Sequence, residues 1–319
     1  MIENIFKICS IMICFLLVLS CSGKDNIIKK QINLHAEFSD YFRHSLIEAS
    51  KTIDKNAEDI KQNYSLSYCP EKYMVSEKSS IYIPKSAVVD AHLCNFLRAT
   101  SIVEDGWLRS YKNNKFISWL YVYDANSKIV KIHPATNPIS MFGEDLIFDT
   151  FHFYSGAVSS YPKGSWAKPK EDINGTGTIL IYSKAVQLQN KPSKAVVAVD
   201  IRIKHFLDKY INAIVNFSEA QNINYLFVIS YIKKDKDIIL VNDFATNPIK
   251  WNAMIKGKIV KKWLKDSLIK QLSDLENEAV RSQGKPVYHT IIINDIKMDC
   301  SLSSINEEIN MYTLFCSDI

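Results

Sequence analysis

One strand–turn–strand pattern occurs twice in this chain, and it limits the possible folds more than any other feature. The first copy spans Trp119–Ile139, where an aromatic and β-branched run is followed by the polar turn Asp124–Lys128 and a second apolar run. The second copy spans Tyr225–Ile249 around the charged turn Lys233–Asp237, and both copies end in Ala-Thr-Asn-Pro-Ile. Such runs, bounded by turn formers, predict β-hairpins. A repeated hairpin with a repeated ending predicts an internal duplication into two related lobes.

Helical and strand patterns surround the two hairpins. A long amphipathic helix is predicted from Ala36 by apolar residues at steps of three and four, namely Phe38, Phe42, Leu46, Ala49, Ile53, Ala57 and Ile60. Its length suggests that it runs beside both lobes. We expect further helices at Ser86–Arg98, His205–Ser218 and Val260–Ser282, and strands at Thr178–Ala185, Lys194–Ile203, Val287–Asn294, Lys297–Leu302 and Met311–Cys316. Strands that pair locally, with helices over one face, indicate an α+β fold.

The size and charge of the chain limit the number of domains and the classes of function. Its 319 residues are enough for two domains of ordinary size. We expect a signal peptide at 1–20, a tether at 21–35, the long helix with the first lobe at 36–210, and the second lobe at 211–319. The net charge of +5 is mild, and the basic residues of Lys256–Lys265 alternate with apolar ones, which argues against nucleic-acid binding.

The N-terminus has the pattern of an export signal with a lipid attachment site. The apolar run Ile8–Leu19 is short for a membrane span and suits a secretory signal. It leads into Val18-Leu-Ser-Cys21, which resembles the lipobox of bacterial lipoproteins. This resemblance implies cleavage before Cys21 and anchoring by several acyl chains, whereas the alternatives are an ordinary cleaved signal or an uncleaved anchor helix. Because Ser22 is not an aspartate, the periplasmic face of the outer membrane is expected in a Gram-negative host.

Four cysteines remain once Cys9 and Cys14 leave with the signal and Cys21 carries lipid. They are Cys69, Cys94, Cys300 and Cys316, two in each lobe. An even number of cysteines in an exported chain favours disulfides. The local pairing, Cys69 with Cys94 and Cys300 with Cys316, is one of three connectivities, and buried free thiols are the alternative. The spacing contains no zinc-binding pattern.

Several stretches, taken in order, carry a family resemblance. They are Trp119–Asp124 with Lys131–Pro134, Phe153–Ala157, Trp166–Asp172 with Gly175–Gly177, and Val196–Ile201. Together they resemble the extracellular double Cache, or PDC-like, sensor domains of bacterial chemoreceptors, histidine kinases and cyclases. The resemblance covers residues 36–319 and implies a long N-terminal helix alongside two stacked PAS-like lobes with antiparallel sheets.

The resemblance also implies which residues surround a ligand in the first lobe. Tyr154 and Asp200 stand where amino-acid-sensing members have a tyrosine and an aspartate. Phe153 stands in place of a tryptophan, Phe151 in place of an arginine, and Lys170 in place of a later tyrosine. Without the arginine the bidentate carboxylate clamp is missing, and Lys170 offers a single positive charge instead. The expected ligand is therefore a small polar molecule, either a carboxylate or an amine.

The residues themselves yield candidates for contacting a small polar ligand, which needs a few well-aimed polar groups in a partly apolar site. The candidates are Tyr121, Tyr123, His133, Tyr154, Trp166, Lys170, Asp172 and Asp200. Asp200 ends a buried strand, where a carboxylate must be paired either by a ligand cation or by a protein donor. Structural roles are the alternatives elsewhere: the aromatic residues of 119–123 fit a core, Trp166 fits a packing anchor, and His133 fits a turn.

Two functions remain after catalysis is set aside. No enzyme, cofactor or metal is expected, because the sequence has no GxSxG, P-loop, GxGxxG or metal-ligand motif. The first function is a lipid-anchored, sensor-type protein that binds a small extracytoplasmic molecule. It would signal through a separate membrane sensor or transporter, since no second apolar span or signalling segment follows Ile319 in this sequence. The second is a ligand-free structural or interaction lipoprotein, whose site is filled by Phe151, Phe153 and Trp166.

Overall fold

The structure is a computed structural model that describes residues 2–64, 78–84, 90–136, 152–172, 177–188, 194–223, 226–234, 237–245, 269–293 and 296–318. The chain divides into two compact units. We call Arg43–Phe206 the central unit, and Met1–Phe42 together with Leu207–Ile319 the terminal unit. The sequence instead predicted lobes at 36–210 and 211–319, because it assigned the whole long helix to the first lobe.

Helix α1 (Ile2–Asn63) begins much earlier than the sequence predicts. Its predicted apolar stripe from Phe38 to Ile60 is buried, with each side chain at most 3% exposed. Residues 21–35, which we expected to form a tether, are helical, and the side chains of Gln31 and His35 are 0% exposed. The structure differs from the expected tether because these polar side chains are buried through hydrogen bonds to a sheet. A hydropathy pattern contains no sign of such partners.

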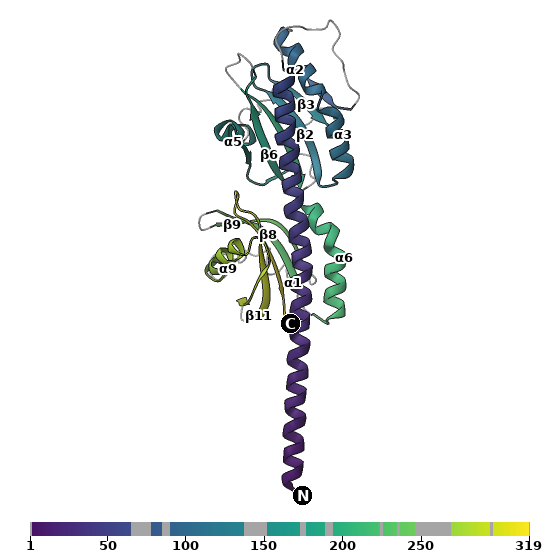
Figure 1. Ribbon diagram of the computed structural model, residues 1–319, viewed down its shortest axis with the longest axis vertical. Coiled ribbons are helices and arrows are strands. Elements are labelled where there is room, and N and C mark those ends of the chain that lie inside the picture. The colour runs from purple at the N-terminus through teal and green to yellow at the C-terminus, as the bar shows by residue number, and fades with distance from the viewer. Residues whose placement is uncertain are drawn as a thin grey trace. The chain divides into compact units, whose positions relative to one another are not determined.

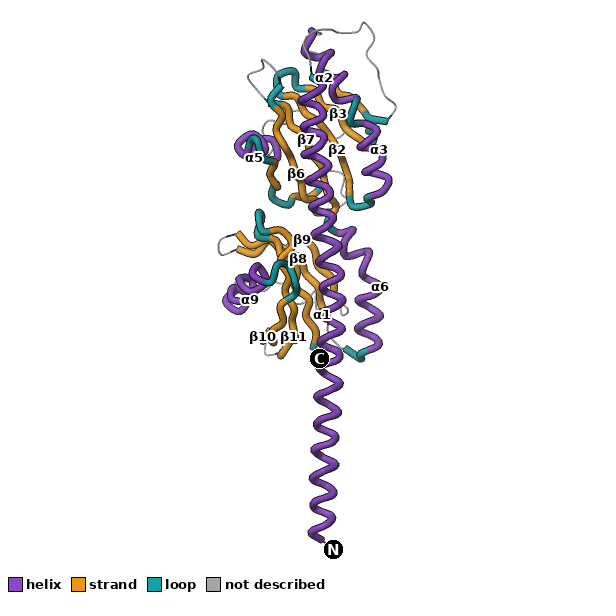
Figure 2. Tube along the Cα trace, in the orientation of Figure 1, coloured by secondary structure: helices purple, strands orange, loops and turns teal. Residues whose placement is uncertain are grey.

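The central unit is built on one antiparallel sheet (Figures 1 and 2). Its strands are β1 (Ser80–Tyr82), β2 (Ile117–Asp124), β3 (Ile129–His133), β4 (Gly164–Trp166), β5 (Lys170–Glu171), β6 (Thr178–Val186) and β7 (Ala195–Arg202). They lie in the order β1-β3-β2-β7-β6-β4, and β5 pairs with β6. Helix α5 (His152–Ser160) packs on β6, β4 and β7, and this side is called the α5 face. The last part of α1, α2 (Ala91–Ser101) and α3 (Glu104–Asn113) contact side chains on the opposite face.

The terminal unit contains a second antiparallel sheet. Its strands are β8 (Leu226–Lys234), β9 (Asp237–Ala245), β10 (Val287–Ile293), β11 (Ile296–Asn306) and β12 (Met311–Ser317), in the order β10-β11-β12-β8-β9. Helix α9 (Ile269–Arg281) packs on β10 and β11. The early part of α1 and helix α6 (Lys204–Ala220) contact side chains of β12 on the other face (Figure 2).

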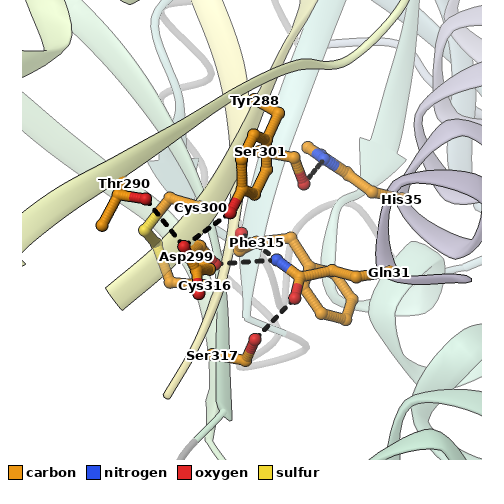
Figure 3. The surroundings of a disulfide bond; sticks show 10 residues. All are labelled: Gln31, His35, Tyr288, Thr290, Asp299, Cys300, Ser301, Phe315, Cys316 and Ser317. Carbon is orange, nitrogen blue, oxygen red and sulfur yellow. Dashed lines mark hydrogen bonds between the residues drawn. A yellow bond between two sulfur atoms is a disulfide. The ribbon is translucent and has the colours of Figure 1, made fainter. Parts of the chain in front are cut away.

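Polar groups attach α1 to the second sheet (Figure 3). Gln31 Nε2 donates to the carbonyl oxygens of Asp299 and Phe315 at 2.9 and 3.1 Å, and Gln31 Oε1 accepts from Ser317 Oγ at 2.5 Å. One turn further on, the His35 ring nitrogens lie 2.8 Å from the hydroxyls of Ser301 and Thr313. The buried face of this helical segment is therefore held by hydrogen bonds as well as by apolar packing.

The two sheets have the same strand order, which is the structural counterpart of the repeated hairpin. In each sheet the second hairpin strand lies at or near one edge, and the first hairpin strand is its neighbour. The last strand of the unit comes next, then the penultimate strand, and finally an earlier strand. Thus β3-β2-β7-β6-β4 corresponds to β9-β8-β12-β11-β10, and α5 corresponds to α9. Of the repeated ending, 137–139 and 246–249 lie outside the described residues.

The α+β prediction is confirmed, and so are both hairpins and the strands that follow them. The sequence analysis identified neither α3 nor β1, which pairs with β3. Strand β1 is three residues long, too short for a period-2 pattern to be recognised. Within the described ranges, no helix combines the length and hydropathy that a membrane span requires.

The cysteines of the second sheet form the expected pair. Cys300 and Cys316 lie opposite each other on β11 and β12 and are joined by a disulfide that links positions 16 residues apart. Cys94 is also disulfide-bonded, and its expected partner Cys69 lies outside the described residues. Cys21 lies within α1.

Candidate functional site

Most of the predicted ligand-binding residues gather on the α5 face of the central sheet. Side chains alternate between the two faces of a strand, and directly paired residues share a face. Tyr121 pairs with Ala198, Asp200 pairs with Trp119 and Ile181, and Lys170 pairs with Ile179. This register puts Tyr121, Tyr123, Lys170 and Asp200 on the α5 face, where Tyr154 also packs against the apolar core.

Helix α5 is fixed to this face by one hydrogen bond and by aromatic contacts. Ser183 Oγ, on β6, donates to the carbonyl oxygen of Phe153 at 2.8 Å. The Phe153 ring meets Tyr121 edge-on, with 5.4 Å between centroids, and Tyr154 meets Tyr123 in the same way at 5.7 Å. The helix thereby orients two tyrosines of β2 that the sequence had singled out.

Asp200 is the most unusual ionisable group on the α5 face. Its side chain is buried, with 7% of the residue exposed, and Tyr121 Oη donates a hydrogen bond to Oδ1 at 2.9 Å. No described residue donates a hydrogen bond to the other oxygen, Oδ2. Burial raises the pKa of Asp200 to about 7; the charge of Lys170 and the Tyr121 hydrogen bond oppose this rise, and the charge of Asp172 adds to it.

Tyr121 remains a hydrogen-bond donor at neutral pH. Its burial, together with the charge of Asp200 and the hydrogen bond to it, raises the pKa of the Tyr121 phenol well above its ordinary value. The phenol is therefore protonated whether or not Asp200 is ionised. Tyr121 is therefore the protein donor that pairs one carboxylate oxygen of Asp200. The second oxygen is available to a cation.

The pairing of β5 with β6 brings Lys170 and Asp172 to Asp200. Strand β5 pairs Lys170 with Ile179 of β6, and the Asp172 amide donates to the carbonyl oxygen of Gly177 at 2.9 Å. Gly177 has a φ of +96°, a conformation that strongly favours glycine and lets the chain return into β6. Both side chains act on Asp200 through their charges, so the cluster combines two carboxylates with one ammonium.

Two predicted site residues lie on the opposite face of the sheet. His133 pairs with Leu120, its Nδ1 lies 2.6 Å from the carbonyl oxygen of Lys78, and its ring meets Tyr111 edge-on at 5.4 Å. Trp166 pairs with Tyr182 and packs against its ring at 5.0 Å. Neither converges with Asp200. Trp166 thus packs as the anchor that the alternative described, whereas His133 belongs to strand β3 and is not the turn residue that the sequence suggested.

Trp119, which the sequence analysis treated as a core residue, lies directly opposite Asp200 on the neighbouring strand. Its indole Nε1 is buried and has no hydrogen-bond partner among the described residues. A buried N–H is normally paired, so this donor is available to a group bound beside Asp200. The strand-pairing register reveals this neighbour, because Trp119 can be aligned with Asp200 only once β2 is known to pair with β7.

A second buried polar cluster lies on the face opposite α5 and has a structural character. Tyr64 Oη lies 2.5 Å from His92 Nδ1, and His92 Nε2 lies 2.7 Å from Asp124 Oδ2. Burial, followed by the charges of Asp124 and Asp90, raises the pKa of Tyr64 to about 12, so the phenol is no nucleophile near neutral pH. The chain of hydrogen bonds joins the end of α1 to α2 and to the hairpin turn.

Metal-binding side chains do not cluster within the described part of the chain: it holds no group of three His, Cys, Asp or Glu side chains placed to bind a metal ion. Sequence comparisons yield no relative, because no protein-family model matches this chain and no curated protein matches it either.

Known structures resemble the chain along most of its length. The ligand-binding domain of the Pseudomonas aeruginosa amino acid chemoreceptor PctC, in complex with GABA, is 13% identical, with 88% of this chain and 95% of that chain covered and a TM-score of 0.50. An extracellular ligand binding receptor from Desulfohalobium retbaense is 10% identical with a TM-score of 0.50, and the match covers 89% of this chain and 39% of that chain. The ligand-binding domain of the Campylobacter jejuni chemoreceptor Tlp3, in complex with L-valine, is 13% identical, with 93% and 95% covered and a TM-score of 0.48.

These likenesses concern the fold. Two antiparallel sheets with the same strand order, preceded by a long helix, form the double Cache architecture of chemoreceptor ligand-binding domains. The fold prediction made from the sequence is therefore confirmed.

Proposed function

We propose that this chain, which has the double Cache fold of ligand-binding sensor domains, binds a small molecule through a positively charged group placed at Asp200. The observation that carries the proposal is the second oxygen of this carboxylate. A buried carboxylate is expensive unless its oxygens are paired, and Oδ2 receives no hydrogen bond from any described residue. A primary or secondary ammonium would complete the pairing with a charge-assisted hydrogen bond.

The charges around Asp200 favour a cation over an anion. Asp172 and Asp200 place two carboxylates beside the ammonium of Lys170. The charge of Lys170 lowers the pKa of Asp200, and the weaker repulsion from Asp172 raises it. A bound cation would offset this repulsion. Lys170 could contact a carboxylate elsewhere on the same ligand, so molecules that carry both groups belong in the same test. Tyr121, Tyr123 and Tyr154 would supply the aromatic surroundings.

The proposed setting is the outside of the cytoplasmic membrane. Cys21 would carry the lipid anchor, as the lipobox resemblance implies, and the bound state would be communicated to a separate membrane sensor or transporter. In a Gram-negative host the anchor would lie in the periplasmic leaflet of the outer membrane. Support comes from the sensor-type fold and from the residues Val18–Cys21.

A ligand-free scaffold is the second candidate, and one contact favours it. The Phe153 ring is 2% exposed and packs against Tyr121, the residue that hydrogen-bonds Asp200. In this case the aromatic side chains of α5 would fill the site and function would depend on a protein-binding surface. Phe151, the other aromatic residue expected to fill the site, lies outside the described residues, and Trp166 lies on the opposite face.

A thermal-shift screen of the full-length protein separates the two functions. The panel contains amino acids, primary and quaternary amines, carboxylates and purines. A ligand at a hundred times its dissociation constant adds about 2.7 kcal/mol to the free energy of unfolding, which raises the melting temperature measurably. We expect an ammonium compound to raise the melting temperature of the wild type.

Variants identify the site of binding. Asp200→Asn keeps the size of the side chain and removes its charge, and it should abolish the thermal shift. Asp208→Asn changes an exposed aspartate on α6 and should preserve it. If no ammonium compound shifts the wild type, or if a shift persists in Asp200→Asn, binding at Asp200 is wrong and the scaffold becomes the better account.

A further inference from the structure

The terminal unit contains a tyrosine–carboxylate pair that parallels the one at Asp200. Strand β8 corresponds to β2 and helix α9 to α5 in the shared strand order. On the α9 side of the second sheet, Tyr231 Oη donates to Glu276 Oε1 at 3.1 Å. Tyr231 is 0% exposed and Glu276 is 4% exposed. Each unit therefore buries a carboxylate beside a tyrosine of its first hairpin strand, although Asp200 belongs to strand β7 and Glu276 belongs to the covering helix α9.

The two carboxylates differ in what reaches their second oxygen. Lys233, two residues after Tyr231 on the same strand, donates from Nζ to Glu276 Oε2, and also to Ser273 Oγ at 3.2 Å. Ser273 and Glu276 lie one turn apart on α9, so the ammonium bridges the strand and the helix. Asp200 Oδ2 receives no hydrogen bond from any described residue, and Lys170 influences it by charge alone.

The surroundings of Glu276 suit an ammonium group. The Tyr231 ring stacks on Tyr312 with 5.5 Å between centroids, and both belong to the apolar core beneath α9. A carboxylate held in such surroundings needs a cation, because its desolvation is otherwise uncompensated. The Lys233 side chain is 24% exposed against 5% for Glu276, so the ammonium approaches from the solvent side of the carboxylate.

We propose that Glu276, Tyr231 and Ser273 form an ammonium-binding site in the terminal unit, which Lys233 of the chain itself occupies. Lys233 then acts as a tethered ligand: it closes in this unit a kind of site that is open at Asp200. Removing the Lys233 side chain beyond Cβ would create a site for a free primary alkylammonium of three carbons. The proposal rests on the contacts within the terminal unit and does not require Asp200 to bind anything.

Chemical rescue of Lys233→Ala tests this site. Every variant also carries Asp200→Asn, so that binding in the central unit cannot contribute. We expect Lys233→Ala to lower the melting temperature by roughly 5–10 °C, since it leaves a buried carboxylate unpaired. Millimolar n-propylammonium should restore at least half of this loss with a saturable dose response, whereas n-butanol should not. The parent protein, which retains Lys233, should not respond.

Two controls make the result decisive. Lys78→Ala removes the exposed ion pair between Lys78 and Asp105, and n-propylammonium should not affect this variant. Adding Glu276→Gln to Lys233→Ala should abolish the response, because a neutral amide no longer attracts the ammonium.

A second variant covers the case in which Lys233→Ala does not fold. Lys233→Met keeps an apolar stem without the charge and should also lower the melting temperature, and Glu276→Gln in the same chain should recover most of that loss. The proposal is overturned if folded Lys233→Ala shows no saturable response to n-propylammonium. It is equally overturned if Lys233→Met melts at the parent temperature.

Discussion

At the scale of single residues, the protein pairs two buried carboxylates in different ways. Glu276 has a tyrosine on one oxygen and a lysine on the other, so both oxygens are hydrogen-bonded within the chain. Asp200 has the tyrosine alone, and burial raises its pKa to about 7. Ionising Asp200 therefore costs free energy in the folded protein, which predicts a pH dependence of stability.

Asp200→Asn should remove that pH dependence. The pKa of Asp200 is higher in the folded chain, about 7, than in the unfolded chain, where it is about 4. Between these values the folded state holds a proton that the unfolded state has lost, so the stability of the wild type falls as the pH rises. Relative to the wild type, Asp200→Asn should gain on the order of 4 kcal/mol on going from pH 4 to pH 8.

Urea denaturation of both proteins at pH 4 and pH 8 measures this gain. Asp208→Asn serves as the control for the loss of one exposed charge. A stability difference between the wild type and Asp200→Asn that is the same at both pH values would show that Asp200 titrates normally in the folded protein.

At the scale of elements, the early part of α1 owes its position to polar side chains. Gln31 and His35, four residues apart, hydrogen-bond β11 and β12 (Figure 3). Ser39, four residues further on, hydrogen-bonds Thr313 of β12. Lys24 of the same helix pairs with Asp299 Oδ2 at 2.9 Å. Burial raises the pKa of Asp299, but the hydrogen bonds from Tyr288, Lys24 and Thr290 outweigh it, and the net pKa is lowered. Asp299 is accordingly ionised when it binds the helix.

Replacing Gln31 with leucine should destabilise the protein even though the helix becomes more apolar. The substitution leaves two carbonyl oxygens and the Ser317 hydroxyl without the partners they have now. Each buried polar group that loses its partner costs about 1–3 kcal/mol, so a total loss of roughly 2–5 kcal/mol is expected. The midpoint of urea denaturation measures it, with Asn33→Leu on the exposed face as the control. A midpoint equal to that of the wild type would mean that these bonds contribute nothing net.

The disulfide between β11 and β12 is a second feature at this scale. Cys300 and Cys316 are 1% and 0% exposed and pack in the core beneath α9. A cross-link that closes a loop of about 15 residues contributes roughly 3 kcal/mol, chiefly by restricting the unfolded chain. Replacing both cysteines with alanine should lower the free energy of unfolding by about that amount. Peptide mapping without reductant should find the two cysteines linked in the wild type, and finding them as free thiols would contradict the pairing.

At the scale of the whole molecule, one sheet plan is used twice and supports different chemistry in each unit. The shared strand order makes β2 equivalent to β8 and α5 equivalent to α9. The two units differ in the side chains between sheet and helix, as Asp200 of strand β7 and Glu276 of helix α9 illustrate. We expect the chain to present one open site, in the central unit, on a protein held at a membrane surface by its N-terminus.

Cys21→Ser tests that attachment. In a bacterial host that processes lipoproteins, the wild type should sediment with membranes and incorporate a radiolabelled fatty acid, because several acyl chains anchor a protein firmly. The variant should lose the label, and any remaining attachment would reflect the apolar run Ile8–Leu19. Cys14→Ser provides the matched control and should retain the label. Equal labelling of wild type and Cys21→Ser would contradict lipidation at Cys21.

By itself, the sequence determined the features that depend on local periodicity and on covalent order. The apolar stripe of α1, the two hairpins and the strand that ends near Asp200 all follow from side chains close together in the chain. The repeated hairpin predicted two lobes, and the resemblance to double Cache sensors implied that these lobes are PAS-like with antiparallel sheets. The resemblance also implied that Tyr154 and Asp200 surround one ligand, and both lie on the α5 face.

Only the tertiary structure decided which polar side chains meet. His133 and Trp166 lie on the opposite face from Asp200 because strand pairing, rather than residue type, sets the face. Residues 21–35 are helical and partly buried because Gln31 and His35 find partners on strands more than 260 residues away in the chain. The second oxygen of Asp200 is open, and that of Glu276 is closed by Lys233. Contacts of this kind are long-range, and no local pattern of hydropathy encodes them.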